Sequence, residues 1–296
     1  MSFSQKQKAD IISQPIKTSC CKTAFLQGVL AARGHAVDGE IHISIDGLES
    51  IEYVTNLIFD IYSKSAEVTS PKSGGRRKLL IFHAKSAEKY LNEINNGKML
   101  HHEKCDLCLS SFLKGVFLAS GRVSDPAKQY SLEFSVGVRV AAFSDFFEDI
   151  GLVPRVSEKK NESVVYFRNS THLEDFFALA GMNQTAFDIM NAKIQGELRN
   201  TANRIVNCET NNIDRAVSAS MSQIALIEEL MEKGLLSLLP EELQSTARFR
   251  MENKDMSLSQ LAGAITPPIS KSGLSHRLKK ITEMAEAVLK DKKDKF

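Results

Sequence analysis

Hydrophobic and polar positions over the first 180 residues follow two periods, one typical of short strands and one typical of helices. Residues 40–45 alternate polar and apolar side chains, as a half-buried strand does, and residues 48–62 have helical spacing. Residues 66–69 and 78–83 flank a glycine-containing turn, which predicts a hairpin, and residues 86–94 predict a closing helix. One more short strand is expected near Ala36.

The same order of elements recurs because the chain contains an internal repeat. Residues 21–34 and 108–121 are identical at seven of fourteen positions, and Cys21 and Cys108 are 87 residues apart, as are Gly34 and Gly121. A strand near residue 123, a strand over 130–138, a helix over 139–150, a hairpin over 153–168 and a helix over 172–179 are then expected. The repeats span about 18–96 and 105–180. They predict an α+β fold in which two αββαββα units form a pseudo-dimer.

Small residues mark one face of the first helix in each copy. Gly28 and Ala32 are four residues apart, as are Gly115 and Ala119, so each pair shares a helix face. Small side chains allow two helix backbones to approach closely. We therefore expect these two helices to pack side by side, with the glycines at their contact.

This repeat resembles the LAGLIDADG homing-endonuclease fold, whose motif ends in two glycines six residues apart, as Gly28 and Gly34 are here. In active members of that family, the residue before the last glycine is an acidic metal ligand. The matching positions here are Arg33 and Ser120. An arginine would repel Mg²⁺ and a serine hydroxyl is a weak ligand, so we predict that the chain is not an enzyme.

Residues 181–296 show no strand pattern and are expected to be helical. Apolar residues from Met190 to Ile205 fit one helical stripe, and those from Ile213 to Met231 suit another helix that Gly234 can end. The expected organisation is a LAGLIDADG-like domain over 1–180, a linker helix over 181–206 and a helix-turn-helix DNA-binding domain over 207–296.

Three short helices near the C-terminus have the order of a helix-turn-helix domain. One spans 241–251, Ser257 can cap a second that ends at Pro267, and Ser270 can cap the last. On that last helix the apolar residues share one side, while the opposite side carries hydroxyls, an imidazole and an ammonium group, which can meet phosphates and base edges. The predicted DNA-binding residues are Ser270, Lys271, Ser272, Ser275, His276, Arg277, Lys279 and Lys280.

Other polar residues allow two interpretations each. An asparagine-rich segment offers secondary DNA contacts at Asn203, Arg204, Asn207 and Arg215, or a solvated helix face. The two hairpins carry Lys72, Arg76, Arg77 and Lys78, and Arg155, Lys159 and Lys160, which could contact phosphates or be solvated turn charges.

Composition and charge narrow the class further. There are 38 Lys and Arg against 36 Asp and Glu, for a net charge of +2, which excludes a strongly basic chromatin-type protein but not a local basic patch. No apolar run approaches the roughly 18–20 residues of a membrane span, and the polar N-terminus lacks the apolar core of a signal peptide. We expect a cytoplasmic, nucleoid-associated protein with no membrane partner, small-molecule substrate or cofactor.

The cysteines leave one chemical question open. Cys105 and Cys108 follow His101 and His102 with a metal-like spacing, and the adjacent pair Cys20–Cys21 could complete a four-sulfur site if the segments meet. Because the side chains of adjacent cysteines diverge, that pair suits one tetrahedral metal poorly. We therefore expect small buried thiols and no metal.

Over nearly its full length, the chain resembles the WhiA family of sporulation and cell-division regulators. The matching segments are 20–28, 112–126, 203–214 and 267–278. The resemblance implies a degenerate LAGLIDADG domain joined to a C-terminal helix-turn-helix, in a bacterial transcription regulator of sporulation or of cell division and chromosome segregation. It implies double-stranded DNA as the partner, with a sigma factor or RNA polymerase as candidate protein partners. The alternatives are a protein-interaction adaptor and a residual nuclease or maturase.

Overall fold

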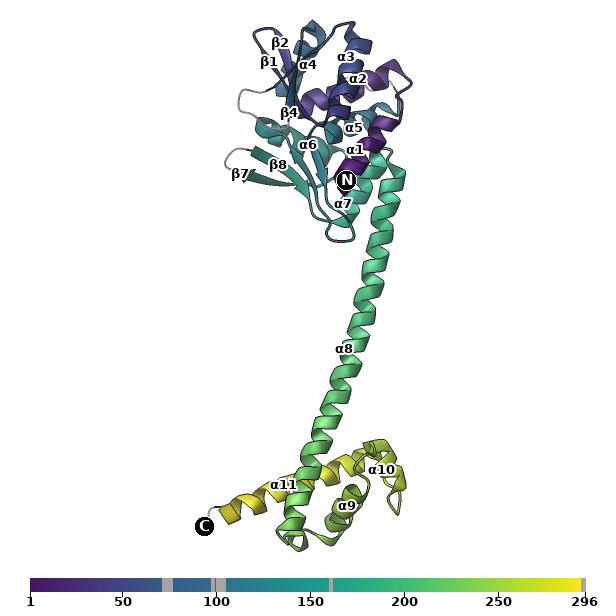
Figure 1. Ribbon diagram of the computed structural model, residues 1–296, viewed down its shortest axis with the longest axis vertical. Helices are drawn as coiled ribbons and strands as arrows, with labels where there is room; N and C mark the ends of the chain where they lie inside the picture. Colours follow the sequence, from purple (N-terminus) through teal and green to yellow (C-terminus); the bar gives the residue numbers. More distant parts are fainter. Residues whose placement is uncertain (71–76, 97–98, 100–104, 160–161, 294–296) are drawn as a thin grey trace. The chain divides into compact units, whose positions relative to one another are not determined.

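The computed structural model describes residues 1–70, 77–96, 99, 105–159 and 162–293. The chain divides into two compact units, Met1–Arg199 (unit 1) and Asn200–Phe296 (unit 2). Figure 1 shows the elements of both units. Among the described residues, no helix combines the length and the apolar character that a membrane crossing requires.

Unit 1 contains the two repeats in the predicted order. The first comprises α2 (Ser19–Arg33), β1 (Gly34–Val37), β2 (Glu40–Asp46), α3 (Leu48–Tyr62), β3 (Glu67–Thr69), β4 (Arg77–Phe82) and α4 (Lys85–Asn95). The second comprises α5 (Cys108–Ser120), β5 (Gly121–Val123), β6 (Leu132–Ser135), the 3-10 turn η1 (Gly137–Arg139), α6 (Val140–Asp149), β7 (Arg155–Lys159), β8 (Glu162–Phe167) and α7 (Ser170–Leu179). The expected α+β fold with tandem αββαββα units is confirmed.

Each repeat forms its own antiparallel four-stranded sheet. The strand orders are β1-β2-β4-β3 and β5-β6-β8-β7, so the two sheets have the same topology. In β2, Ile41, Ile43 and Ile45 point to the buried side, as the alternating pattern predicts. The strand β6 is shorter than the expected 130–138 because the chain turns at Gly137, whose φ is +58°.

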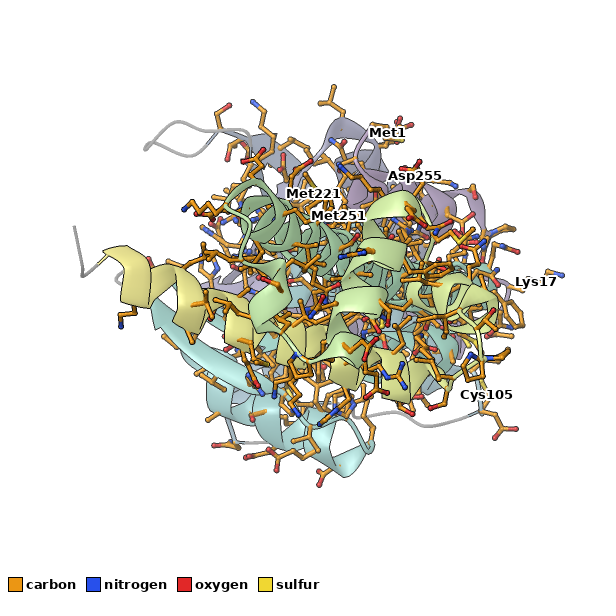
Figure 2. All side chains as sticks on the ribbon, turned by 90° about the horizontal axis from the view of Figure 1, so that it is seen from below. Met1, Lys17, Cys105, Met221, Met251 and Asp255 are labelled. Atoms are coloured by element: carbon orange, nitrogen blue, oxygen red, sulfur yellow. The ribbon has the colours of Figure 1, made fainter. Side chains whose placement is uncertain are left out.

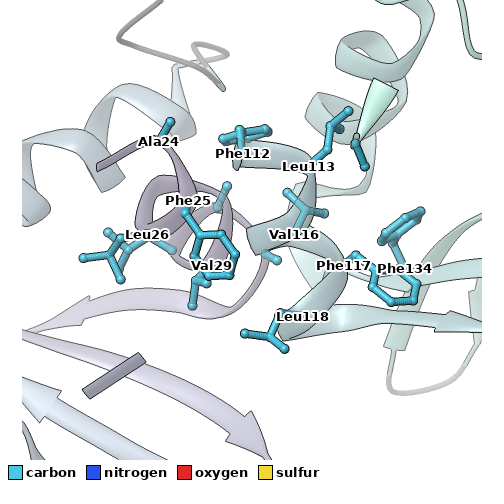
Figure 3. Close-up of a cluster of buried hydrophobic side chains, with 14 of the residues drawn as sticks. Ala24, Phe25, Leu26, Val29, Phe112, Leu113, Val116, Phe117, Leu118 and Phe134 are labelled. Atoms are coloured by element: carbon cyan, nitrogen blue, oxygen red, sulfur yellow. The ribbon is translucent and has the colours of Figure 1, made fainter. Parts of the chain in front are cut away.

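The helices α2 and α5 pack against each other at the centre of unit 1. A Cβ added to Gly28 would lie 2.1 Å from the backbone oxygen of Phe112, and one added to Gly115 would lie 2.0 Å from that of Phe25. Only glycine fits either place, so the expected glycine contact is confirmed. Figure 3 shows side chains of both helices, among them Val29 and Phe112, in one apolar cluster.

A helix that the sequence analysis did not anticipate precedes the first repeat. It is α1 (Phe3–Ser13), and Ser2 caps it through a reciprocal pair of hydrogen bonds with Gln5. Its buried residues are Gln7 and Ile11, and the amide oxygen of Gln7 accepts a hydrogen bond from the hydroxyl of Thr185. Two buried positions in eleven residues are too few to give a clear helical pattern in the sequence.

A single helix, α8 (Asn183–Glu232), runs for 50 residues through the region where two helices were expected. The expected domain limit at 206/207 therefore falls inside a helix. Residues 197–219 of α8 are all exposed, so no tertiary packing marks the asparagine-rich segment as helical. The sequence pattern predicts two helices because the apolar stripe of α8 is weak over residues 197–219.

Unit 2 is entirely helical in its described part. The last turns of α8 are followed by η2 (Leu236–Leu238), α9 (Glu241–Glu252), α10 (Leu258–Ala264) and α11 (Lys271–Lys293). Ser257 and Gln260 form a capping box that starts α10. The three-helix order predicted for this region is confirmed. Its core includes Leu261, Leu274 and Leu278, together with Ile227 from α8.

Candidate nucleic-acid interface

The helix α11 is held by its cap and by one apolar face. The hydroxyl of Ser270 accepts a hydrogen bond from the amide of Gly273 at 3.0 Å, which makes Ser270 the expected N-cap. Leu274, Leu278 and Ile281 are between 0% and 1% exposed and belong to the core of unit 2. Three buried residues at helical spacing give α11 one orientation about its own axis, and this orientation decides which residues face solvent.

The opposite face of α11 is open to solvent. At about 100° per residue, Ser275, His276 and Lys279 all lie within about 60° of Ser272 around the helix. Their groups can donate hydrogen bonds, and the hydroxyls and a neutral imidazole can also accept them. No residue from 270 to 280 is acidic. The exposed residues on and beside this face are Lys271, Ser272, Ser275, His276, Lys279 and Lys280.

Two cations of α11 have acidic neighbours. Arg277 forms an ion pair with Glu242 of α9, and its side chain is only 28% exposed. Lys279 lies 3.7 Å from Glu283 one turn along, but with 76% of its side chain exposed this pair is weak. The ammonium group of Lys279 can therefore leave Glu283 at little cost, whereas Arg277 is held against α9.

One buried cation of unit 2 was missed by the sequence analysis. Arg250 is 2% exposed, donates to the backbone oxygen of Met256 at 2.7 Å and also contacts the hydroxyl of Ser220 on α8. It joins the end of α9 to the loop before α10 and to α8. Its position seven residues after Leu243 and three after Ala247, on the buried stripe of α9, was the available signal.

The asparagine-rich residues of α8 form an exposed polar side. Asn203, Arg204, Asn207 and Arg215 are all exposed, as either interpretation of the segment requires. At about 100° per residue, Asn203 and Asn207 lie about 140° and 180° from Leu198, so they are opposite the apolar stripe.

The cations of the two hairpins are only partly described. Lys72, Arg76 and Lys160, and the side chain of Lys159, lie outside the described residues. Lys78 donates to the hydroxyl of Ser70 at 2.7 Å, and Arg155 is exposed on β7.

The positions that correspond to a LAGLIDADG cleavage centre carry no carboxylate. Arg33 ends α2, and the hydroxyl of Ser120 donates to the backbone oxygen of Val116 within its own helix α5 at 3.1 Å. Lys8 lies nearby: burial, with smaller contributions from the charges of Arg33 and Arg122, lowers its pKa to about 8, although the charge of Asp46 acts to raise it. The two matching positions therefore offer a divalent cation no carboxylate ligand.

Comparisons with known proteins place these features in one family. The family models for the WhiA LAGLIDADG-like domain and the WhiA C-terminal HTH domain match residues 109–199 and 202–285. The "Probable cell division protein WhiA" of Caldicellulosiruptor saccharolyticus is 30% identical, over 98% of this chain and 96% of its own length. The protein of the same name from Clostridium acetobutylicum is 32% identical, over 98% and 99%. The crystal structure of full-length WhiA from Thermotoga maritima matches with a TM-score of 0.60 at 23% identity, covering 97% of this chain and 99% of that one, and so supports the fold.

Proposed function

The chain belongs to the WhiA family, and we propose that it is a sequence-specific DNA-binding transcription regulator without nuclease activity. In this proposal α11 enters the major groove of double-stranded DNA and reads base edges. The protein acts in the cytoplasm on the nucleoid. Because its relatives are named as probable cell division proteins, we propose a role in cell division or chromosome segregation, or in sporulation where the organism forms spores.

One observation carries the proposal: the exposed face of α11 is basic and polar. The packing of the opposite, apolar face keeps these basic and polar side chains in solvent. Ser275 and His276 are short enough to reach base edges from a helix in the major groove, where each base pair shows a distinct pattern of donors and acceptors. Lys280 and Lys271 flank them and suit phosphates, which carry no sequence information. The first-turn amides of α11 also attract phosphate.

The direct test is genome-wide crosslinking of the tagged full-length protein, followed by binding assays on the recovered sites. We expect a small set of sites that share a sequence motif and that bind the purified protein more tightly than random DNA of equal length. A crosslinking pattern without a shared motif, together with equal affinity for all DNA, would contradict sequence-specific reading.

The absence of nuclease activity is part of the proposal and needs its own test. Arg33 and Ser120 replace the acidic ligands of active LAGLIDADG enzymes, and Lys8 adds positive charge beside them. Plasmid DNA incubated with the purified protein and Mg²⁺ should remain supercoiled. If nuclease activity co-elutes with the protein in the last purification step, the nuclease alternative would be supported.

The adaptor alternative has one favourable observation, which concerns α8. Ile194, Leu198 and Ile205 lie within about 40° of one another around the helix and are each more than half exposed, and exposed apolar residues on one face are typical of a protein-binding surface. We propose that a sigma factor or RNA polymerase is a candidate protein partner in addition to DNA. Copurification of polymerase subunits that is lost when Leu198 and Ile205 are changed to Gln, with DNA binding unchanged, would support this.

A further inference from the structure

Four of the five cysteines converge at one end of the central helix pair. Cys20 and Cys21 lie in the first turn of α2, Cys108 is the first residue of α5, and Cys105 precedes it by three residues. The Cys105 sulfur lies 3.6 Å from that of Cys20, 3.5 Å from that of Cys21 and 3.6 Å from that of Cys108. All four sulfurs lie within 4.8 Å of one another.

These spacings match those of a single tetrahedral ion. A zinc–sulfur bond is about 2.3 Å long, so the sulfurs of a regular tetrahedron around zinc are about 3.8 Å apart. The observed separations reach that value with shifts of a few tenths of an ångström for the three nearest pairs. A polynuclear iron–sulfur cluster would hold the thiolates farther apart, because its own iron and sulfide atoms lie between them.

Packing alone does not account for the set. Cys21 and Cys108 are 3% and 0% exposed and could serve as small core residues. Cys105, however, is exposed, and Figure 2 shows it at the margin of the side chains in that view. An exposed cysteine beside three other thiols has no packing role, but it gives a metal site an open side through which an ion can enter.

The local backbone also favours thiolates. Cys20, Cys21 and Cys108 lie in the first turns of two helices, where free amide groups and the helix dipole stabilise negative charge. The adjacent pair Cys20–Cys21, which the sequence disfavours as joint ligands, has both sulfurs within 3.6 Å of Cys105. The two side chains are therefore close enough to share one ion.

We propose that unit 1 holds a structural zinc ion between the first turns of α2 and α5. Its ligands are Cys20, Cys21, Cys105 and Cys108. On binding, each thiol releases its proton to solvent and donates a sulfur electron pair to Zn²⁺, so four protons leave and the site carries a charge of −2. With four protein ligands no position stays open for a substrate, so the ion clamps the two repeats together and performs no chemistry. This inference does not depend on DNA binding.

The exposed fifth cysteine, Cys208 on α8, supplies the control. The full-length protein, freed of any affinity tag and purified from zinc-supplemented cells without chelator, should contain one zinc per chain by mass spectrometry. Cys208→Ser should keep that zinc, whereas Cys105→Ser should lose most of it. Wild-type protein without zinc, or Cys105→Ser with a full complement, would overturn the proposal. Stoichiometric iron in place of zinc would also overturn it.

A second measurement avoids dependence on the variants' folding. Wild-type protein stripped with a chelator under reducing conditions, and still folded by circular dichroism, is titrated with Co²⁺. We expect thiolate-to-cobalt absorption bands that saturate at one equivalent and disappear when Zn²⁺ is added. Folded protein that shows no such bands contradicts the site. The protein as purified is also denatured without reductant and alkylated. If the four proposed ligands resist alkylation, they form disulfides, which contradicts the site as well.

Discussion

Arg277 of α11 is paired with Glu242 of α9, so one cation of the proposed reading helix is held by the helix that supports it. The pair is partly exposed and contributes about 0.2–1 kcal/mol to folding at most. Its importance is positional, since it draws the guanidinium toward α9. Lys280, which is exposed beside the reading face, is therefore the better phosphate ligand of the two.

Replacing Lys280 by Ala should weaken binding to specific and to random DNA about equally, because a phosphate contact is independent of sequence. The plot of log affinity against log salt should flatten by roughly one unit. Lys290→Ala, which removes the same charge about 15 Å farther along α11, is the control and should change the slope little. A Lys280→Ala variant that loses specific binding only would mean that Lys280 reads bases.

Alanine at Ser275 or His276 should act on the preferred site. We expect a loss of about 1–3 kcal/mol there and much less on random DNA, because base contacts carry the discrimination. Fluorescence anisotropy with both DNAs at one salt concentration measures the difference. If the triple change at Ser275, His276 and Lys279 leaves operator affinity intact, α11 is not the reader, and the segment from Asn203 to Asn212 becomes the better candidate.

Adding one methyl group at the helix contact should destabilise unit 1. In Gly115→Ala the new Cβ would lie 2.0 Å from the backbone oxygen of Phe25, so α2 and α5 must separate, at a cost of at least about 1–3 kcal/mol. Gly196→Ala on α8, where a Cβ meets nothing within 4 Å, should stabilise by roughly 0.5–1 kcal/mol. Urea unfolding measures both. Equal effects of the two changes would contradict the close contact.

Lys8 should make unit 1 more stable at high pH. Burial lowers its pKa from 10.5 to about 8, so below pH 8 the folded protein bears the full cost of a buried charge. Between pH 8 and 10.5 the unfolded chain binds more protons, so this contribution to the free energy of unfolding rises with pH. Lys8→Met should therefore stabilise at pH 7 and have a smaller effect at pH 10, relative to wild type. Lys6→Met, at an exposed position of α1, is the control; a gain independent of pH would contradict the assignment.

The middle of α8 should be the first part of the chain to open. Residues 197–219 are all exposed, and helix turns without tertiary contacts have low local stability. Brief trypsin treatment should cut near Arg199, Arg204 or Arg215 and release two fragments that each remain folded. If both units stay folded while this segment resists cleavage, the two units form a fixed assembly.

The sequence predicts most of unit 1 because its two repeats report the same pattern twice. The glycine spacing around Gly28 and the alternation in β2 depend on neighbours along the chain, so they are visible without a structure. The face of α11 is predictable for the same reason, since Leu274 and Leu278 alone fix its buried side.

What the sequence does not predict depends on segments far apart in the chain. Cys105 lies beside Cys20 although 85 residues separate them along the chain, and both sulfurs of the adjacent pair Cys20–Cys21 reach Cys105. From the sequence, Arg250 is expected at the surface like most arginines. Its burial depends on contacts with Ser220 and with the backbone at Met256. The continuity of α8 was missed because an exposed helix needs no strong apolar stripe.

The contact between α2 and α5 is reciprocal: Gly28 meets the backbone of Phe112, and Gly115 meets the backbone of Phe25, the residue 87 positions before Phe112. Two separate copies of one repeat could form the same contact, but any substitution in them would appear on both sides of the axis. A single chain is free of that duplication. It can carry Arg33 at one position and Ser120 at the matching one. The side chains of one repeat can therefore differ from those of the other while the glycine contact between α2 and α5 stays the same.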